Sequence, residues 1–228
     1  MLSSIISSVI NQEENKIEYT QVAVLLDNSG SMHTMGCERI QSLRNLYEDQ
    51  KKAGPFKSTL AIFSNKMEYI HKDIIGSEIG EIKDFIPDGM TALYDSIMEI
   101  TLPFILDGIK KGILVIITDG LENASNKNNS TSVKTQINIL EKMDWKVIYL
   151  GANQDSFTVA KDIGINTSQD YEATPLGFNN MMRAVSEGLS RQISGEGEFV
   201  VKKPSSVPLK FEDPVNDFDL VSKTLFRS

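Results

Sequence analysis

Val22-Ala-Val-Leu-Leu-Asp-Asn-Ser-Gly-Ser-Met32 is the stretch that decides the fold. Its first five residues are apolar and are bounded by polar and turn-forming residues, which is typical of a strand buried on both faces of a parallel sheet. The strand ends at Asp27, and two serines with a glycine between them follow. One short loop therefore carries a carboxylate and two hydroxyls, the hard oxygen ligands that Mg²⁺ prefers.

Outward from this stretch, apolar strand patterns alternate with helical periods along most of the chain. We predict strands at 19–26, 58–63, 67–74, 112–118, 146–150 and 165–168, and helices at 38–53, 77–86, 91–107, 132–142, 155–163 and 174–193. The short polar link Ser64-Asn65-Lys66 indicates a hairpin, so the third strand is predicted to be an antiparallel edge strand. Pro103 is expected to kink or interrupt its helix. The predicted fold class is α/β, a three-layer, doubly wound, mostly parallel Rossmann-like sheet.

Three segments are predicted. Residues 1–18 form an N-terminal extension with an amphipathic helix, because apolar residues recur there at helical spacing while a positive n-region and a cleavage site are lacking. Residues 19–194 form the α/β domain. Residues 195–228 contain three prolines and no long period, which indicates an extended arm, either disordered or packed on this domain or a neighbour. Within it, 199–202 could pair as a strand.

Composition narrows the function classes. The formal net charge is −8, with 31 acidic and 23 basic side chains and no basic cluster, so a nucleic-acid partner is not expected. Cys37 is the only cysteine, which excludes an intrachain disulfide and favours a reducing compartment; we expect it to be half-buried near a helix start. The longest unbroken aliphatic run is Ile113 to Ile117, too short for a membrane span. A cytoplasmic, intracellular protein is predicted.

Two further segments carry oxygen ligands. The strand 112–118 ends, like the first strand, in a carboxylate, here Asp119, and Thr91 supplies a hydroxyl at the start of a predicted helix. In a doubly wound sheet, ligands bind at the carboxyl ends of the strands where the winding direction reverses. If the two apolar strands are neighbours there, the set of two carboxylates and three hydroxyls comes together. The predicted metal ligands are Asp27, Ser29, Ser31, Thr91 and Asp119.

These residues resemble the metal-ion-dependent adhesion site of von Willebrand factor type A domains. The resemblance is carried by Asp27-Asn-Ser-Gly-Ser-Met32, by Gly89-Met-Thr91 and by Thr118-Asp-Gly120, and it covers about residues 19–193. Met90 departs from the pattern, since a second glycine often precedes the threonine. The resemblance implies that the three hydroxyls bind Mg²⁺, with Mn²⁺ or Ca²⁺ as alternatives, and that the carboxylates hold it directly or through water. It also implies that the ion grips an acidic residue of a protein partner.

Two other functions are alternatives to metal-dependent protein binding. A metal-dependent hydrolase or phosphatase is disfavoured because the position of a second catalytic aspartate is Ser29, and the only histidines are His33, expected in a solvated loop, and His71. The chain is therefore expected not to be an enzyme. A scaffold or virion-associated assembly protein could instead bind through the loop 123–130 and the C-terminal arm without metal. Intracellular members of the resembled family occur in bacteria, phages and large viruses; the oligomeric state is not set by the sequence.

Overall fold

The computed structural model describes residues 18–152 and 156–201, which build one six-stranded sheet. The strands lie in the order β3-β2-β1-β4-β5-β6, and every neighbouring pair is parallel except β2 and β3. Their bounds are β1 Thr20–Asp27, β2 Phe56–Phe63, β3 Met67–Ile75, β4 Gly112–Thr118, β5 Trp145–Ala152 and β6 Thr167–Tyr171. The predicted mostly parallel sheet with one antiparallel edge strand is confirmed.

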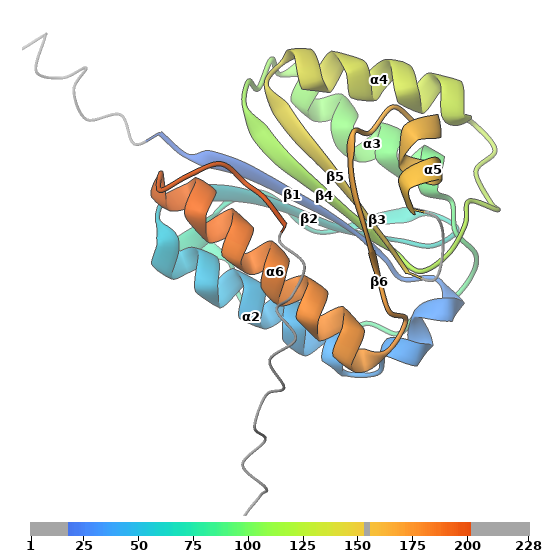
Figure 1. The fold of residues 1–228 in the computed structure, drawn as a ribbon, viewed down its shortest axis with the longest axis horizontal. Helices are drawn as coiled ribbons and strands as arrows, with labels where there is room; N and C mark the ends of the chain where they lie inside the picture. The colour runs from blue at the N-terminus through green and yellow to red at the C-terminus, as the bar shows by residue number, and fades with distance from the viewer. Residues whose placement is uncertain (1–17, 153–155, 202–228) are drawn as a thin grey trace, which may run out of the picture.

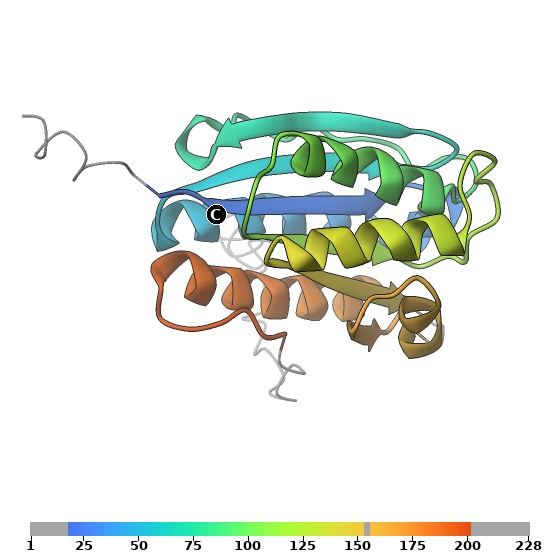
Figure 2. The ribbon, with the colours of Figure 1, turned by 90° about the horizontal axis from the view of Figure 1, so that it is seen from above.

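Helices cover both faces of this sheet and complete the three layers (Figures 1 and 2). One face carries α2 (Glu38–Ala53) and α6 (Pro175–Ser194), which lie side by side along their lengths. The other face carries α3 (Leu93–Leu106), α4 (Ser130–Lys142) and the short α5 (Ser156–Asp162). None of the described helices is long and apolar enough to cross a membrane.

The central strands are apolar throughout because each of their faces has its own core. In β1, Val22, Val24 and Leu26 face the core under α2 and α6, while Ala23 and Leu25 face the core under α3 and α4. Successive strand residues point to opposite faces, so a strand covered on both sides cannot alternate apolar with polar residues. Burying each of the valine and leucine side chains contributes about 1.5–3 kcal/mol, which favours β1 in the middle of the sheet.

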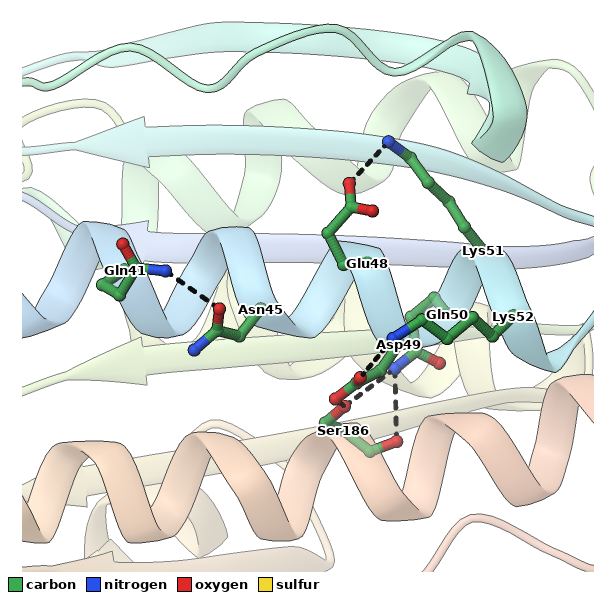
Figure 3. Close-up of polar contacts among 8 residues, drawn as sticks. All are labelled: Gln41, Asn45, Glu48, Asp49, Gln50, Lys51, Lys52 and Ser186. Atoms are coloured by element: carbon green, nitrogen blue, oxygen red, sulfur yellow. Dashed lines mark hydrogen bonds and ion pairs between the residues drawn. The ribbon is translucent and has the colours of Figure 1, made fainter. Parts of the chain in front are cut away.

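A buried polar contact joins α2 to α6 (Figure 3). The Gln50 Nε2 donates to the Ser186 carbonyl at 3.2 Å and to the Ser186 Oγ at 3.1 Å, and that hydroxyl donates to the Asp49 Oδ2 at 3.0 Å. Gln50 is fully buried. Because buried N–H groups are costly unless they are hydrogen-bonded, the bonds of the Gln50 nitrogen favour this pairing of the two helices.

The predicted helix at 77–86 is wrong. Only Gly76–Glu78 forms a short 3-10 helix, η2, and the chain from 79 to 92 has no regular secondary structure. Two carbonyls of this segment accept hydrogen bonds from α2: Arg44 donates to the Ile82 carbonyl at 2.7 Å and Arg39 to the Phe85 carbonyl at 2.9 Å. Two long guanidinium side chains thus replace the bonds of a helix, which the local sequence pattern could not reveal.

Other expectations were wrong in detail. The helix predicted from Thr91 begins at Leu93. Pro103 lies within α3, which continues to Leu106, so the alternative of an interruption is wrong, and the alternative of a kink stays a prediction. Residues 199–201 form no strand; Phe199 is instead buried beside α6, where its amide donates to the Gln192 Oε1 at 3.0 Å. Cys37 is exposed, at the residue before α2. The predicted N-terminal helix and most of the C-terminal arm lie outside the described residues.

Candidate metal centre

The sheet topology brings the two predicted carboxylates to one edge. β1 and β4 are adjacent and parallel, with Leu26 beside Ile117, so both strands end at the same level. The strand order reverses direction between them, which is the switch point where doubly wound sheets bind ligands. Asp27 is the last residue of β1, and Asp119 follows the last residue of β4.

Asp27 forms the buried floor of the site. Its side chain is 0% exposed and accepts hydrogen bonds from the Ser29 amide at 2.7 Å and from the Thr118 hydroxyl at 2.6 Å. Burial raises the pKa of the Asp27 carboxyl, although these hydrogen bonds oppose the shift. The hydrogen bonds therefore do not fully offset the cost of burying the negative charge of Asp27.

The two serines hold their hydroxyls together above Asp27. The Ser29 Oγ and the Ser31 Oγ are 3.1 Å apart, and the Ser31 hydroxyl donates to the Asp119 Oδ1 at 2.6 Å. Ser29 is buried and Ser31 is exposed. The loop continues as the 3-10 helix η1 (Gly30–Met35), whose Met32 and Met35 are buried in the core and anchor it.

Thr91 reaches the same point from a third segment. A Cβ placed on Gly120 would be 3.0 Å from the Thr91 Oγ1, 3.7 Å from the Ser31 Oγ and 3.8 Å from the Asp27 Oδ2. Oxygens from two separate segments therefore surround one small volume, which Gly120 of a third segment leaves open. With Ser29 bonded to Ser31, and Asp119 bonded to Ser31, all five predicted residues come together.

The charges and donor types of this site fit a hard divalent cation. Burial raises the pKa of the Asp119 carboxyl as well as that of Asp27. The charge of Arg39 acts on both carboxylates, but its side chain is buried and hydrogen-bonded to the Asn28 Oδ1 at 2.6 Å. Within the described residues no group of three or more His, Cys, Asp or Glu side chains gathers, so hydroxyls must supply much of any coordination here. Such oxygen sets suit Mg²⁺ or Mn²⁺ better than Zn²⁺.

Sequence reasoning missed several residues that support the site. Arg39 could have been found, because it shares the apolar face of α2 with Leu43 and Leu46 at helical spacing, where a charged residue needs a buried role. Thr118, which bonds Asp27, stands beside a predicted ligand but was not assigned a function. Asn65 and Asn123 lie in turns, where asparagine is common, so no sequence signal distinguishes them.

No family model and no curated protein matches the sequence. Solved structures do match at the level of fold. The ArnB paralog VWA2 from Sulfolobus acidocaldarius gives a TM-score of 0.53 at 18% identity, over 75% of this chain and 46% of that chain. Manganese-loaded Plasmodium vivax TRAP protein gives 0.52 at 15% identity, over 68% of this chain and 69% of that chain.

A third solved structure carries the name of the fold. The von Willebrand factor type A protein from Catenulispora acidiphila gives a TM-score of 0.52 at 10% identity, over 77% of this chain and 43% of that chain. The chain thus spans less than half the length of this protein and of VWA2. At these identities the likeness concerns the arrangement of the sheet and its helices. The described residues have the fold of von Willebrand factor type A proteins.

Proposed function

We propose that this chain is a Mg²⁺-dependent protein-interaction module. Asp27, Ser29, Ser31, Thr91 and Asp119 would hold the cation, and an aspartate or glutamate of a protein partner would bind to it. The observation that carries the proposal is the convergence of the Thr91, Ser31 and Asp27 oxygens on the space beside Gly120. The manganese in the TRAP structure, a protein of the same fold, is consistent with a divalent cation at such a site.

The pattern of buried and exposed site residues favours a ligand that approaches the site from solvent. Asp27, Ser29 and Thr91 are buried, whereas Ser31 is exposed and Asp119 is half-buried. A bound Mg²⁺ would supply an electrophilic centre for a carboxylate oxygen, and the protein's own residues would hold it from below. If the hydroxyls bind the ion directly and the two carboxylates act partly through water, Mg²⁺ would keep Lewis acidity and a coordination position for an external carboxylate.

Exposed apolar side chains beside the site favour a macromolecular partner. Met90 is 53% exposed and Leu121 is 60% exposed, and each is the chain neighbour of a residue that lines the site, Thr91 and Gly120. Apolar area next to a charged anchor is typical of protein interfaces. We therefore expect Met90→Ser with Leu121→Ser to weaken capture of a protein partner while leaving Mg²⁺ affinity unchanged.

Isothermal titration with Mg²⁺ tests the metal half of the proposal. Metal-stripped wild type should bind Mg²⁺, Asp27→Ala should lose the heat of binding, and Ser29→Ala should bind more weakly. Ser77→Ala is a matched control, because Ser77 is an exposed serine in η2. Equal heats from all four proteins would overturn the assignment of these ligands.

The partner half is tested by the effect of chelation. Proteins captured from the source cell by the immobilised chain should be released by EDTA, and Asp119→Ala should fail to capture them. A set of partners that ignores EDTA would favour the scaffold function, with binding through other surfaces. Turnover in a panel of phosphate and carboxyl esters that disappears in Asp119→Ala would favour the hydrolase. An intracellular location stays a prediction from the sequence.

A further inference from the structure

Three consecutive amides around Thr91 donate to acceptors from other segments. The Met90 amide donates to the Asn65 Oδ1 at 2.6 Å, the Thr91 amide to the Asn123 Oδ1 at 2.8 Å, and the Ala92 amide to the Ser64 carbonyl at 2.8 Å. Asn123 makes a second bond, since its own amide donates to the Thr91 carbonyl at 3.1 Å. The backbone of Thr91 is thus bonded on both its polar groups by one residue.

These bonds matter because Thr91 belongs to no helix or strand. It lies two residues before α3, and Ala92, at the N-cap position, provides no side-chain cap. The preceding Gly89 has a φ of 82°, a conformation that favours glycine, and a Cβ there would be 2.8 Å from the Asn65 Oδ1. The position of the Thr91 hydroxyl therefore depends on acceptors from outside its own segment.

The loop that carries Asn123 is itself bonded to the first turn of α3. The Glu122 carboxylate accepts from the Tyr94 amide at 2.8 Å and from two amides of its own loop, at 2.9 and 2.7 Å. The Asp95 carboxylate accepts from the amides of Asn126 and Asn128, at 3.0 and 2.9 Å. Both carboxylates are occupied by N–H donors, so they act as structural anchors and not as metal ligands.

We propose that Asn65 and Asn123 are positioning residues that hold the Thr91 hydroxyl beside Gly120, near the Ser31 and Asp27 oxygens, for cation binding. The inference rests on the proposed function. The neutral side-chain oxygen of Asn65 accepts from the Met90 amide, and that of Asn123 accepts from the Thr91 amide. Asn123 also links Thr91 to the loop that follows Asp119. A neutral amide does this without adding a third negative charge beside the site. Outer residues that orient ligands commonly change metal affinity by about 10–100-fold.

Alanine variants with a matched control test this role. Asn123→Ala and Asn65→Ala should each weaken Mg²⁺ binding by about tenfold in isothermal titration. Asn128→Ala is the control, because Asn128 lies in the same loop as Asn123 but its side chain donates to Asp95 of α3, at 2.9 Å. Both Asn65 and Asn123 are exposed, so their variants are expected to fold. Thermal unfolding in EDTA should shift no more for them than for the control.

Amide hydrogen exchange of the metal-free protein supplies a readout that does not depend on Mg²⁺. Exchange at Thr91 should be accelerated in Asn123→Ala and exchange at Met90 in Asn65→Ala, while Asn128→Ala should leave both unchanged. Asn123→Asp, which keeps an acceptor oxygen, should restore protection of Thr91. If wild type binds Mg²⁺ and the two variants bind it as tightly as the control, the positioning role is overturned and the metal site stands.

A different result in the Mg²⁺ titration would overturn the proposed function instead. Wild type that binds no Mg²⁺ would refute the metal site, and the exchange data would then decide separately whether the asparagines hold the Thr91 segment. Unchanged exchange at Thr91 in Asn123→Ala would overturn the inference whatever the metal result. Accelerated exchange there would support the positioning of Thr91.

Discussion

The Ser31 hydroxyl donates to the Asp119 Oδ1 at 2.6 Å, although 88 positions separate the two residues in the sequence. This bond joins the loop after β1 to the loop after β4 directly across the switch point of the sheet. The ends of the two strands are joined as well, by the Thr118 hydroxyl, which donates to the Asp27 Oδ2 at 2.6 Å. Two hydroxyls thus partly satisfy two carboxylates that have no cation bonded to them in the described contacts. A divalent cation between the two loops would neutralise the remaining negative charge of Asp27 and Asp119.

Mg²⁺ is expected to stabilise the folded chain, because the five ligands are assembled only when the strands are. A ligand that binds only the folded state adds about 2.7 kcal/mol at a free concentration 100 times its Kd. Thermal unfolding measured in Mg²⁺ and in EDTA should therefore differ by several degrees for wild type. The difference should vanish in Asp27→Ala; an equal shift in that variant would mean that Mg²⁺ acts elsewhere.

Gly120→Ala should weaken Mg²⁺ binding by about tenfold or more. The new methyl group would lie 3.0 Å from the Thr91 Oγ1, in the volume that the ligand oxygens share. Gly80→Ala is the control, because a Cβ at Gly80 has no atom within 4 Å. Isothermal titration of both variants is the measurement. Retained affinity in Gly120→Ala would place the ion away from this volume.

Arg39→Met should destabilise the fold by roughly 2–4 kcal/mol, since it removes a buried guanidinium and leaves its partners without a donor. Arg39 is 2% exposed, donates to the Asn28 Oδ1 and the Phe85 carbonyl, and lies 4.7 Å from the centre of the Phe85 ring. Arg44→Met, one turn further along α2 and more exposed, also removes a bond to the 79–92 segment and should cost less. Urea denaturation in EDTA measures both changes. Equal losses of unfolding free energy in the two variants would show that the buried contacts of Arg39 stabilise the fold no more than those of Arg44.

The sequence was sufficient for the central part of the fold because its signals there are local and redundant. The apolar runs 22–26 and 113–117 can be buried on both faces only between two layers of helices. The turn at Ser64-Asn65-Lys66 makes β3 antiparallel to β2. The convergence of Asp27 and Asp119 follows from that topology. The five predicted site residues lie together for this reason, and their role as metal ligands stays a prediction.

What the sequence could not give are interactions between distant segments. The helix expected at 77–86 has suitable local residues, yet its carbonyls bond arginines of α2, so tertiary contacts override local preference. The support of Thr91 by Asn65 and Asn123 likewise depends on turns that meet only in the folded chain. Asparagine in a turn carries no sign of a second role.

Stability is expected to fall in mild acid because of His71. Its ring lies on β3 beside the Tyr47 ring, with the Nε2 2.8 Å from the Ser58 Oγ, and burial lowers its pKa from 6.5 to about 4. Between these values the unfolded chain binds a proton that the folded chain excludes. The contribution of His71 is therefore complete above pH 6.5 and is lost as the pH falls toward 4.

The loss assigned to His71 is expected to be on the order of 1–3 kcal/mol, and it has to be separated from other titrating groups. The raised pKa values of Asp27 and Asp119 act in the opposite direction, because protonation relieves their burial as the pH falls. Urea denaturation of wild type and His71→Gln at pH 7.5, 6 and 5 isolates the difference, since both proteins keep the two carboxylates. The stability of wild type relative to His71→Gln should decrease at each step toward acid. A difference that stays constant across this range would mean that His71 titrates as it does in the unfolded chain.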